Sequence, residues 1–347
     1  MKISLCMIVK NEEKYLERCL NSVKNIVDEI VIVDTGSSDK TVEIAKKFTN
    51  RIYFYKWHND FAAARNFSFS KATNNYIMWL DADDIFSENQ STLFLERKKK
   101  LYEDFIRIKY ITNIDSNGNI VHSNYRARII KKGKYSWQGQ IHEVIPVDYS
   151  DINSAWEEIE IIHSPNEYKV KPLYLNIFEE IKNKYTFGER EKFLYARELM
   201  SHNRNDEALE IFLEINQNEY YKNNAYYYIG KIFLLKKEFS KCLKFLIKIP
   251  NKNSDICYLI GDIYLEIKLY NQSIFWYQSA ILDNENYIVN KQNGNLNAFI
   301  KLVYIYIVKK DYIKSSYYLN KAKKINPKNQ NVINYEKYLI YMLGGNK

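Results

Sequence analysis

The sequence predicts an α/β domain built on a mostly parallel sheet, followed by an all-α domain of helical repeats. Through about residue 90, short runs rich in β-branched residues alternate with amphipathic segments, which is the pattern of strands joined by helices. From about residue 169 onward the strand patterns vanish and paired helical segments recur. The length of 347 residues suits about two domains. We therefore expect domains at residues 1–168 and 169–347.

The strands expected in the first domain are continuous apolar runs, and its helices have one apolar face. The expected strands are residues 3–9, 29–33, 51–55 and 76–80, and the expected helices are 12–23, 39–48 and 61–71. Continuous apolar runs are typical of parallel strands that are buried on both faces. The alternation of strands and helices thus predicts a parallel sheet covered by helices on both sides.

Small or apolar residues recur in pairs in the second domain. The pairs are Ala196 and Ala208, Gly230 and Cys242, Gly261 and Ser273, and Val303 and Ser315. Large residues follow in register at Phe212, Leu246, Tyr277 and Leu319. The second members are separated by 34 (208 to 242), 31 (242 to 273) and 42 residues (273 to 315), and an Asn-rich insertion at 284–297, expected to be a loop, lengthens the last interval. A period near 34 predicts tetratricopeptide-like repeats, whose helix hairpins stack because one repeat cannot bury its own apolar face.

The composition excludes several classes of protein. With 46% hydrophobic residues, 10 Gly and 5 Pro, the chain is neither intrinsically disordered nor collagen-like. No apolar stretch approaches the ~18 residues that would suggest a membrane span, so we expect a cytoplasmic protein. The four cysteines form no C-x-x-C pair, and we expect free thiols. The net charge of +9 comes without a dense basic block, so nucleic acid is not an expected partner.

Polar residues follow three of the expected strands at their carboxyl ends. They are Lys10-Asn11-Glu12-Glu13, Asp34-Thr35-Gly36-Ser37 and Asp81-Ala82-Asp83-Asp84. Ligands of open parallel sheets bind at this edge. The carboxylates of Asp81 and Asp83 suit Mg²⁺ or Mn²⁺, which prefer oxygen ligands and leave positions open for phosphates; a solvated turn or a helix cap is the structural alternative. Neither a P-loop nor a G-x-G-x-x-G motif is present.

Several segments resemble the family-2 glycosyltransferases of the GT-A fold, whose sheet is Rossmann-like and mostly parallel. These segments are residues 4–12, 32–39, 60–66 and 80–84. Residues 126–129, 139–143 and 162–163 are similar to the subgroup that carries a tetratricopeptide tail. The sublancin-type bacteriocin S-glycosyltransferases within this family pair the same two kinds of domain. The resemblance implies a GT-A catalytic domain at 1–168.

The resemblance also implies which residues bind the nucleotide. Asp34 is similar to the family aspartate that contacts the base or ribose, and Asn11 and Glu12 lie in the first nucleotide-binding loop. Arg65 and Asn66 resemble a helical pair near the nucleotide and the metal loop. The structural alternative for Arg65 is an ion pair at the acidic edge. For Glu12 it is a charge that the helix dipole favours.

The metal ligands follow from the same resemblance. Asp83 is similar to the main ligand of Mn²⁺ or Mg²⁺, and Asp81 to a contact with the donor sugar, the ribose or the metal. His163 resembles a late histidine that reaches the diphosphate or the metal, and its structural alternative is a hydrogen-bonded histidine at a domain junction.

The acceptor side is implied by a His-Glu pair. An inverting displacement needs a base opposite the leaving nucleoside diphosphate. We expect Glu143 to be this base, with His142 beside it to orient it or to bind the sugar, while His142 and Asp84 are competing candidates for the base. Basic residues that either neutralise the diphosphate or line a solvated strand edge are Arg126, Arg128, Lys131 and Lys132.

These expectations define a metal-dependent inverting glycosyltransferase. It would move a hexose from a nucleotide-sugar, UDP-linked in our expectation, to Cys or Ser/Thr of a peptide or protein such as a bacteriocin precursor. A peptide acceptor is favoured because concave helical arrays commonly bind peptides. A cell-surface glycan acceptor and a non-catalytic repeat scaffold are the alternatives. The relatives also allow a homodimer through or near the repeat domain.

Overall fold

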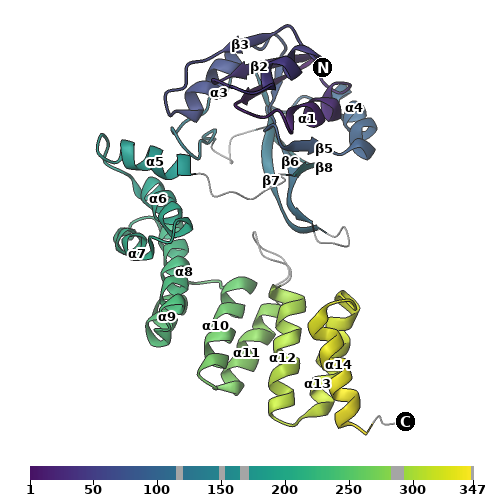
Figure 1. The fold of residues 1–347 in the computed structure, drawn as a ribbon, viewed down its shortest axis with the longest axis vertical. Helices are drawn as coiled ribbons and strands as arrows, with labels where there is room; N and C mark the ends of the chain where they lie inside the picture. Colours follow the sequence, from purple (N-terminus) through teal and green to yellow (C-terminus); the bar gives the residue numbers. More distant parts are fainter. Residues whose placement is uncertain (115–119, 148–152, 165–171, 283–292, 345–347) are drawn as a thin grey trace. The chain divides into compact units, whose positions relative to one another are not determined.

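The computed structural model describes residues 1–114, 120–147, 153–164, 172–282 and 293–344. Its contacts divide the chain into two units, Met1–Lys184 and Tyr185–Lys347 (Figure 1). This division falls later than the boundary at 168 expected from the sequence. The reason is helix α5 (Pro172–Ile181), which packs against the first unit: the ring of its Tyr174 lies 5.5 Å from the ring of His142.

The first unit is built on a sheet whose described strands are ordered β3-β2-β1-β4-β7-β6-β8-β5. The strands are β1 (Ile3–Val9), β2 (Glu29–Asp34), β3 (Ile52–Phe54), β4 (Tyr76–Met78), β5 (Asp84–Phe86), β6 (Phe105–Ile114), β7 (Ile120–Lys131) and β8 (Ser154–His163). Strands β1 to β4 are parallel, as predicted, and β6 pairs with β8 in parallel. The pairs β4–β7, β6–β7 and β5–β8 are antiparallel. The sheet is therefore mixed and mostly parallel.

Helices cover both faces of this sheet. They are α1 (Leu16–Val23), α2 (Thr41–Lys46), α3 (Phe61–Ser70), the 3-10 turn η1 (Glu88–Gln90) and α4 (Ser91–Lys99). Leu5 and Met7 of β1 share one core cluster with Leu20 of α1, whereas Cys6 shares the other cluster with Phe69 of α3. Successive residues of β1 thus enter cores on opposite faces, which explains why the strand is apolar without alternation.

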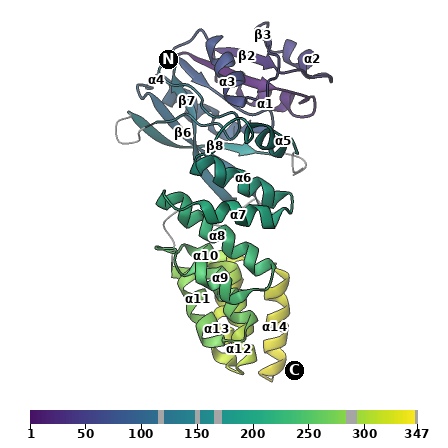
Figure 2. The same cartoon turned by 90° about the vertical axis from the view of Figure 1, so that its left-hand side faces the viewer.

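The second unit is a tetratricopeptide-like array of paired helices. The pairs are α6 (Glu189–Ser201) with α7 (Asn205–Glu214), α8 (Glu219–Leu235) with α9 (Phe239–Leu246), α10 (Ser254–Glu266) with α11 (Tyr270–Leu282), and α12 (Ala298–Val308) with α13 (Tyr312–Ile325), followed by α14 (Gln330–Met342). Figure 1 shows α12, α13 and α14 side by side, and Figure 2 shows the same helices turned by 90°. Of the insertion expected at 284–297, residues up to 292 lie outside the described ranges, and η2 (Asn293–Asn297) is a π-helical turn. Within the described ranges, every helix lacks the combined length and hydropathy that a membrane crossing needs.

Each helix pair closes with the same local geometry. Two residues after the end of the first helix lies a residue with positive φ: Asn203 (62°), Lys237 (58°), Lys268 (59°) and Lys310 (60°). The N–H of the next residue then reaches back to a carbonyl of the helix, as in Arg204 to Leu199 at 2.9 Å. This is the Schellman arrangement that satisfies the last carbonyls of a helix while reversing the chain.

The residue pairs recognised in the sequence hold the two helices of a repeat together. The hydroxyl of Ser273 donates to the carbonyl of Gly261 at 2.9 Å, and that of Ser315 donates to Val303 at 3.1 Å. A Cβ at Gly261 would lie 2.8 Å from the ring of Tyr277, so the glycine permits close helix packing. All four of the large residues that follow in register are buried.

Candidate active site

The site lies where β1, β2 and β4 end. The buried carboxylate of Asp84 lies beneath it. This side chain is 0% exposed and forms an ion pair with Arg128 Nη2 at 3.1 Å. Tyr110 Oη donates to Asp84 Oδ1 at 2.7 Å, and the backbone N–H of Asp81 donates to Oδ2 at 3.0 Å. Both carboxylate oxygens of Asp84 are therefore engaged in contacts that hold the loop after β4 in place. Its use as a catalytic base is not favoured by these contacts.

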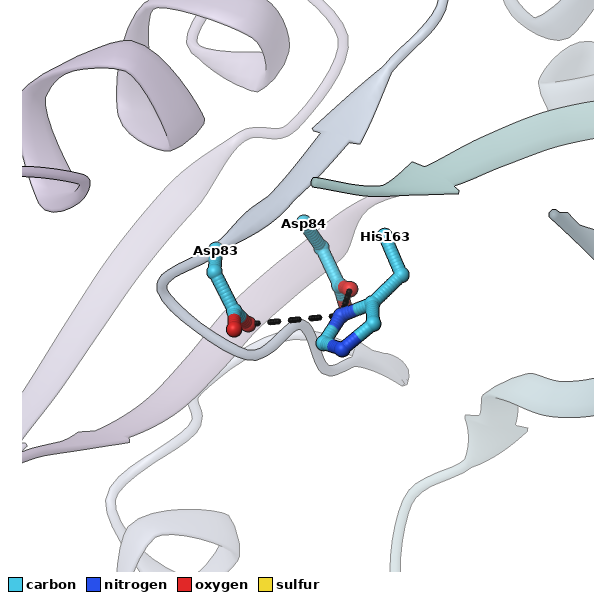
Figure 3. Close-up of side chains that lie close together, drawn as sticks. All are labelled: Asp83, Asp84 and His163. Atoms are coloured by element: carbon cyan, nitrogen blue, oxygen red, sulfur yellow. Dashed lines mark hydrogen bonds and ion pairs between the residues drawn. The ribbon is translucent and has the colours of Figure 1, made fainter. Parts of the chain in front are cut away.

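His163 joins this loop because β5 pairs with β8. In the antiparallel register Asp84 lies opposite His163. The imidazole Nδ1 of His163 lies 3.2 Å from Asp84 Oδ1 and 3.5 Å from Asp83 Oδ1 (Figure 3). The backbone N–H of Ser164 donates to the carbonyl of Asp83 at 3.0 Å, which fixes the end of β8 to the acidic loop.

The carboxylates of Asp81, Asp83 and Asp84 shift the pKa values of this group. Burial and the charges of Asp81 and Asp84 raise the pKa of Asp83 above its usual value, against the opposing effect of His163. Burial alone would lower the pKa of His163, but its hydrogen bond to Asp84 and the surrounding carboxylates raise it. The raised pKa of His163 reports the negative charge of the carboxylates around it, whereas burial is the largest cause of the raised pKa of Asp83. A divalent cation would neutralise this negative charge.

The donor set suits such a cation. One ligand atom from each of Asp83, Asp84 and His163 can be chosen so that all lie within 4.8 Å of one another. The side chains of Asp83 and His163 are each 25% exposed, whereas the oxygens of Asp84 already have protein partners. Asp83 and His163 are thus the more accessible side chains of the three, and Asp84 contacts the imidazole as the partners of metal-bound histidines commonly do. The roles of Asp83 and His163 as metal ligands stay predictions. Asp81 lies outside this group, and its role as a metal ligand stays a prediction.

Arg65 of α3 links two acidic segments across the site. Its Nη2 lies 2.8 Å from Asp81 Oδ1 and its Nε lies 2.6 Å from Glu143 Oε1. The guanidinium carbon is 5.1 Å from the centre of the Trp137 ring. Burial would raise the pKa of Asp81, but the Arg65 charge outweighs it and holds this pKa well below its usual range. The structural alternative foreseen for Arg65, an ion pair at the acidic edge, is therefore present.

The loop that carries His142 and Glu143 packs on the edge of α3 and on α5. His142 has a φ of 50°, is exposed, and its ring lies 5.5 Å from Tyr174 and 6.1 Å from Phe178. The side chain of Glu143 is 12% exposed. The two residues therefore point to different surroundings: Glu143 faces Arg65, and His142 faces α5. Their catalytic roles stay predictions.

Asn66 fixes this loop from α3. Its Nδ2 donates to the carbonyl of Trp137 at 3.0 Å, and the N–H of Trp137 donates to Asn66 Oδ1 at 2.8 Å. Both polar atoms of the amide are thus engaged by backbone. The predicted contact between Asn66 and a nucleotide is not supported by these bonds and stays a prediction.

Asp34, at the end of β2, has one oxygen left for a ligand. Its Oδ1 accepts from the N–H groups of Gly36 and Ser37, both at 3.0 Å. Its Oδ2 is buried and has no hydrogen-bond partner in the described part of the chain. Buried polar atoms are normally hydrogen-bonded, so this oxygen fits a donor group of a bound ligand.

The first nucleotide-binding loop predicted from the resemblance packs on the turn after Asp34. Asn11 has a φ of 56°, its N–H donates to Ser37 Oγ at 2.9 Å and its Oδ1 accepts from Ser38 N–H at 2.8 Å. The N–H of Glu12 donates to Thr41 Oγ1 at 2.7 Å. Both predicted residues therefore lie beside Asp34 at the same edge of the sheet.

Tyr110 and Arg128 are parts of the site that sequence reasoning missed or misplaced. Arg128 was expected at the diphosphate or on a solvated strand edge, but its side chain is 3% exposed and binds Asp84. The apolar residues Ile129 and Ile130 that follow it are the signal that could have placed it in the buried part of a strand. Tyr110 carried no signal, because it is one of 31 tyrosines.

Comparisons with known proteins bear on both units. Residues 4–148 match the family model described as Glycosyl transferase family 2. The chain is 29% identical over 246 residues to the SPbeta prophage-derived glycosyltransferase SunS of Bacillus subtilis (strain 168), which covers 67% of this chain and 57% of that relative. It is 47% identical over 83 residues, 24% of the chain and 21% of the relative, to the TPR repeat-containing protein Synpcc7942_0270 of Synechococcus elongatus. The crystal structure of S. aureus TarS 1-349 in complex with UDP aligns with a TM-score of 0.34 and 15% identity, over 81% of this chain and 90% of that one. The chain thus spans a little over half the length of SunS.

Proposed function

We propose that this protein is an inverting, metal-dependent glycosyltransferase, on the ground that residues 4–148 match the family model described as Glycosyl transferase family 2. It transfers a hexose from a nucleotide-sugar, UDP-linked in the proposal, to Cys or Ser/Thr of a peptide or protein. The observation that carries the proposal is the group formed by Asp83, Asp84 and His163 at the carboxyl edge of the sheet. Its excess negative charge is suited to the cation that a diphosphate leaving group requires.

The donor end of the proposal rests on Asp34. Its buried Oδ2 is open to an N–H or O–H of the nucleoside. The turn that presents it is held by bonds from Gly36, Ser37 and the loop of Asn11. Because β1 lies between β2 and β4 in the sheet, Asp34 and Asp83 flank one stretch of the carboxyl edge. A nucleoside at Asp34 would thus extend its diphosphate toward Asp83.

The chemical step needs a charge-stabilised leaving group and a proton acceptor. A divalent cation, when bound by Asp83 and His163, supplies positive charge that stabilises the departing diphosphate. Asp84 holds His163 in place and is itself held by Arg128 and Tyr110.

We assign proton removal from the acceptor to Glu143. Arg65 binds its Oε1 and fixes the carboxylate, while Oε2 has no hydrogen bond or ion pair to the described residues. A thiol loses its proton more readily than a hydroxyl and therefore needs less help from a base. An acceptor cysteine, such as the one modified by an S-glycosyltransferase, thus fits this arrangement well.

The peptide acceptor is proposed from two observations. The chain carries a tetratricopeptide-like unit, and such arrays offer extended surfaces that bind peptides. SunS, the relative with 29% identity, is named a glycosyltransferase of a prophage. A bacteriocin precursor is the acceptor that the sublancin-type resemblance favours.

A hydrolysis and transfer assay tests this proposal. UDP-glucose and UDP-N-acetylglucosamine are incubated with the protein, a mixture of Cys and Ser peptides and Mn²⁺, with or without EDTA. We expect UDP release and the mass shift of the transferred sugar on peptides, both abolished by EDTA and by Asp83→Ala. Asp104→Ala is the control, because this carboxylate pairs with Lys131 and Lys134 away from the site. Activity that survives both chelation and Asp83→Ala would refute the chemistry. Transfer to a glycan array under the same conditions, with no labelled peptide, would refute the peptide acceptor.

A further inference from the structure

Arg126 lies on β7 beyond the end of β4. The two strands are antiparallel, with Met78 opposite Ile129 as the last pair of β4. Residues of β7 that precede Ile129 therefore extend past the carboxyl edge, beside the loop that carries Asp83. The strand order β2-β1-β4-β7 puts Arg126 on the opposite side of that loop from Asp34. Arg126 thus lines the half of the site that faces away from the proposed nucleoside position.

The guanidinium of Arg126 stacks on the ring of Tyr110, which also contacts the group of Asp83, Asp84 and His163. Its Cζ lies 4.3 Å from the centre of the Tyr110 ring, and its Nε donates to Asn124 Oδ1 at 3.3 Å. The same tyrosine donates to Asp84, and its ring lies 5.7 Å from the ring of His163. Tyr110 therefore contacts Asp84, His163 and Arg126 at once, and it orients the guanidinium of Arg126 beside the acidic loop.

Of the two guanidiniums stacked on this ring, that of Arg126 has no carboxylate partner among the described residues. Arg128, also stacked on Tyr110 at 4.4 Å, is paired with Asp84, and Arg65 is paired with Asp81 and Glu143. Arg126 is exposed, and its two terminal nitrogens have no partner among the residues that the structure describes. Two guanidiniums that share one ring repel each other unless an anion lies near the outer one.

We propose that Arg126 binds an oxyanion on the acceptor side of the metal group, through the two N–H groups that its terminal nitrogens present in one plane. This proposal rests on the proposed function. The oxyanion is either a carboxylate or phosphate of the acceptor or the diphosphate of the donor. The position of Arg126 away from Asp34 favours the acceptor, and in a peptide the group would be the side chain of Asp or Glu near the modified residue.

The test compares Arg126→Gln, which removes the charge, with Arg126→Lys, which keeps it without the planar pair of donors. Lys71→Gln is the matched control, because Lys71 is also a cation stacked on a ring, 4.5 Å from that of Phe67, at the far end of α3. UDP is titrated calorimetrically into each variant with Mn²⁺. Paired Cys peptides that differ only by Glu or Gln beside the cysteine are then glycosylated and quantified by mass spectrometry.

For an acceptor oxyanion, we expect Arg126→Gln to bind UDP like the unaltered protein and to lose about tenfold in its rate on the Glu peptide, with little change on the Gln peptide. Arg126→Lys should keep part of the preference for Glu. For a donor oxyanion, UDP affinity itself should fall about tenfold. The proposal is overturned if Arg126→Gln matches Lys71→Gln in UDP affinity and in both peptide rates. If the unaltered protein neither binds UDP nor labels a peptide, the proposed function fails instead.

Discussion

The Nε of Arg65 donates to Oε1 of Glu143 at 2.6 Å, although 78 residues separate them in the sequence. The same guanidinium pairs with Asp81, so α3 connects the acidic loop after β4 to the loop that carries Glu143. The side chains of Arg65 and Glu143 are only 11% and 12% exposed. Ion pairs shielded to this degree are costly to break, because the remaining charge is left without compensation.

Arg65→Gln should therefore lower the free energy of unfolding by about 3–5 kcal/mol, since it leaves Asp81 and Glu143 as unpaired neighbours. Urea denaturation measures this loss. Lys47→Gln removes one partner of an exposed pair, with side chains 59% and 50% exposed, and should cost less than about 1 kcal/mol. Equal losses in the two variants would show that the Arg65 pairs contribute no more than a surface ion pair.

Asp34→Asn should weaken UDP binding by about ten- to a hundredfold. The amide oxygen can keep the bonds from Gly36 and Ser37, so the turn is retained while a donor replaces the unpartnered Oδ2. Calorimetric titration with UDP and Mn²⁺ measures the change. Asp28→Asn is the control, because Asp28 pairs with Lys98 and accepts from the N–H of Ile3 at the other end of β1. Unaltered affinity in Asp34→Asn would rule out Asp34 as a nucleoside contact.

Gly261→Ala should destabilise the repeat unit by about 1–3 kcal/mol, although alanine favours helices more than glycine does. The added Cβ would lie 2.8 Å from Tyr277, whose ring is fully buried and cannot move aside. Thermal unfolding and urea denaturation measure the loss. Ala196 occupies the equivalent position of the first aligned pair and already carries a Cβ. Ala196→Gly is therefore the reciprocal variant. A stabilised Gly261→Ala variant would contradict the packing described.

Glu29 should make stability depend on acid pH. Burial would raise its pKa, but hydrogen bonds from Ser4 and Thr73 and the charge of Arg51 outweigh it and lower the pKa. A carboxyl whose pKa is lower in the folded state stabilises the fold above its unfolded value of about 4.3 and loses that contribution as pH falls through the folded value. Glu29→Gln should thus be less stable than the unaltered protein at pH 7, and the difference should shrink below about pH 4. A pH-independent difference in urea midpoints would exclude this linkage.

The sequence predicted the parallel half of the sheet and the repeats because both depend on local patterns. Continuous apolar runs mark strands buried on two faces, and the pairs such as Gly261 and Ser273 recur at a fixed interval. The expected strand at 76–80 ends at Met78 in the structure, where the chain begins to turn toward the acidic loop.

The site was predictable only as far as strand ends meet at one edge. That reasoning brings Asn11, Asp34 and Asp83 together. The contacts of Asp84 with Arg128 and Tyr110 depend on the pairing of β4 with β7 and of β7 with β6, which no local pattern specifies. The pair of Arg65 and Glu143 depends likewise on how the later loop packs against α3.

The central claim is that Asp83 and His163 hold the divalent cation that a sugar diphosphate requires. Titration of Mn²⁺ into the protein with saturating UDP, followed by electron paramagnetic resonance of the free ion, measures it directly. We predict about one tight Mn²⁺ site per chain, weakened about a hundredfold or more by Asp83→Asn and about tenfold by His163→Gln, and unchanged by Asp104→Asn. Tight Mn²⁺ binding that is equal in Asp83→Asn and the unaltered protein would contradict the account.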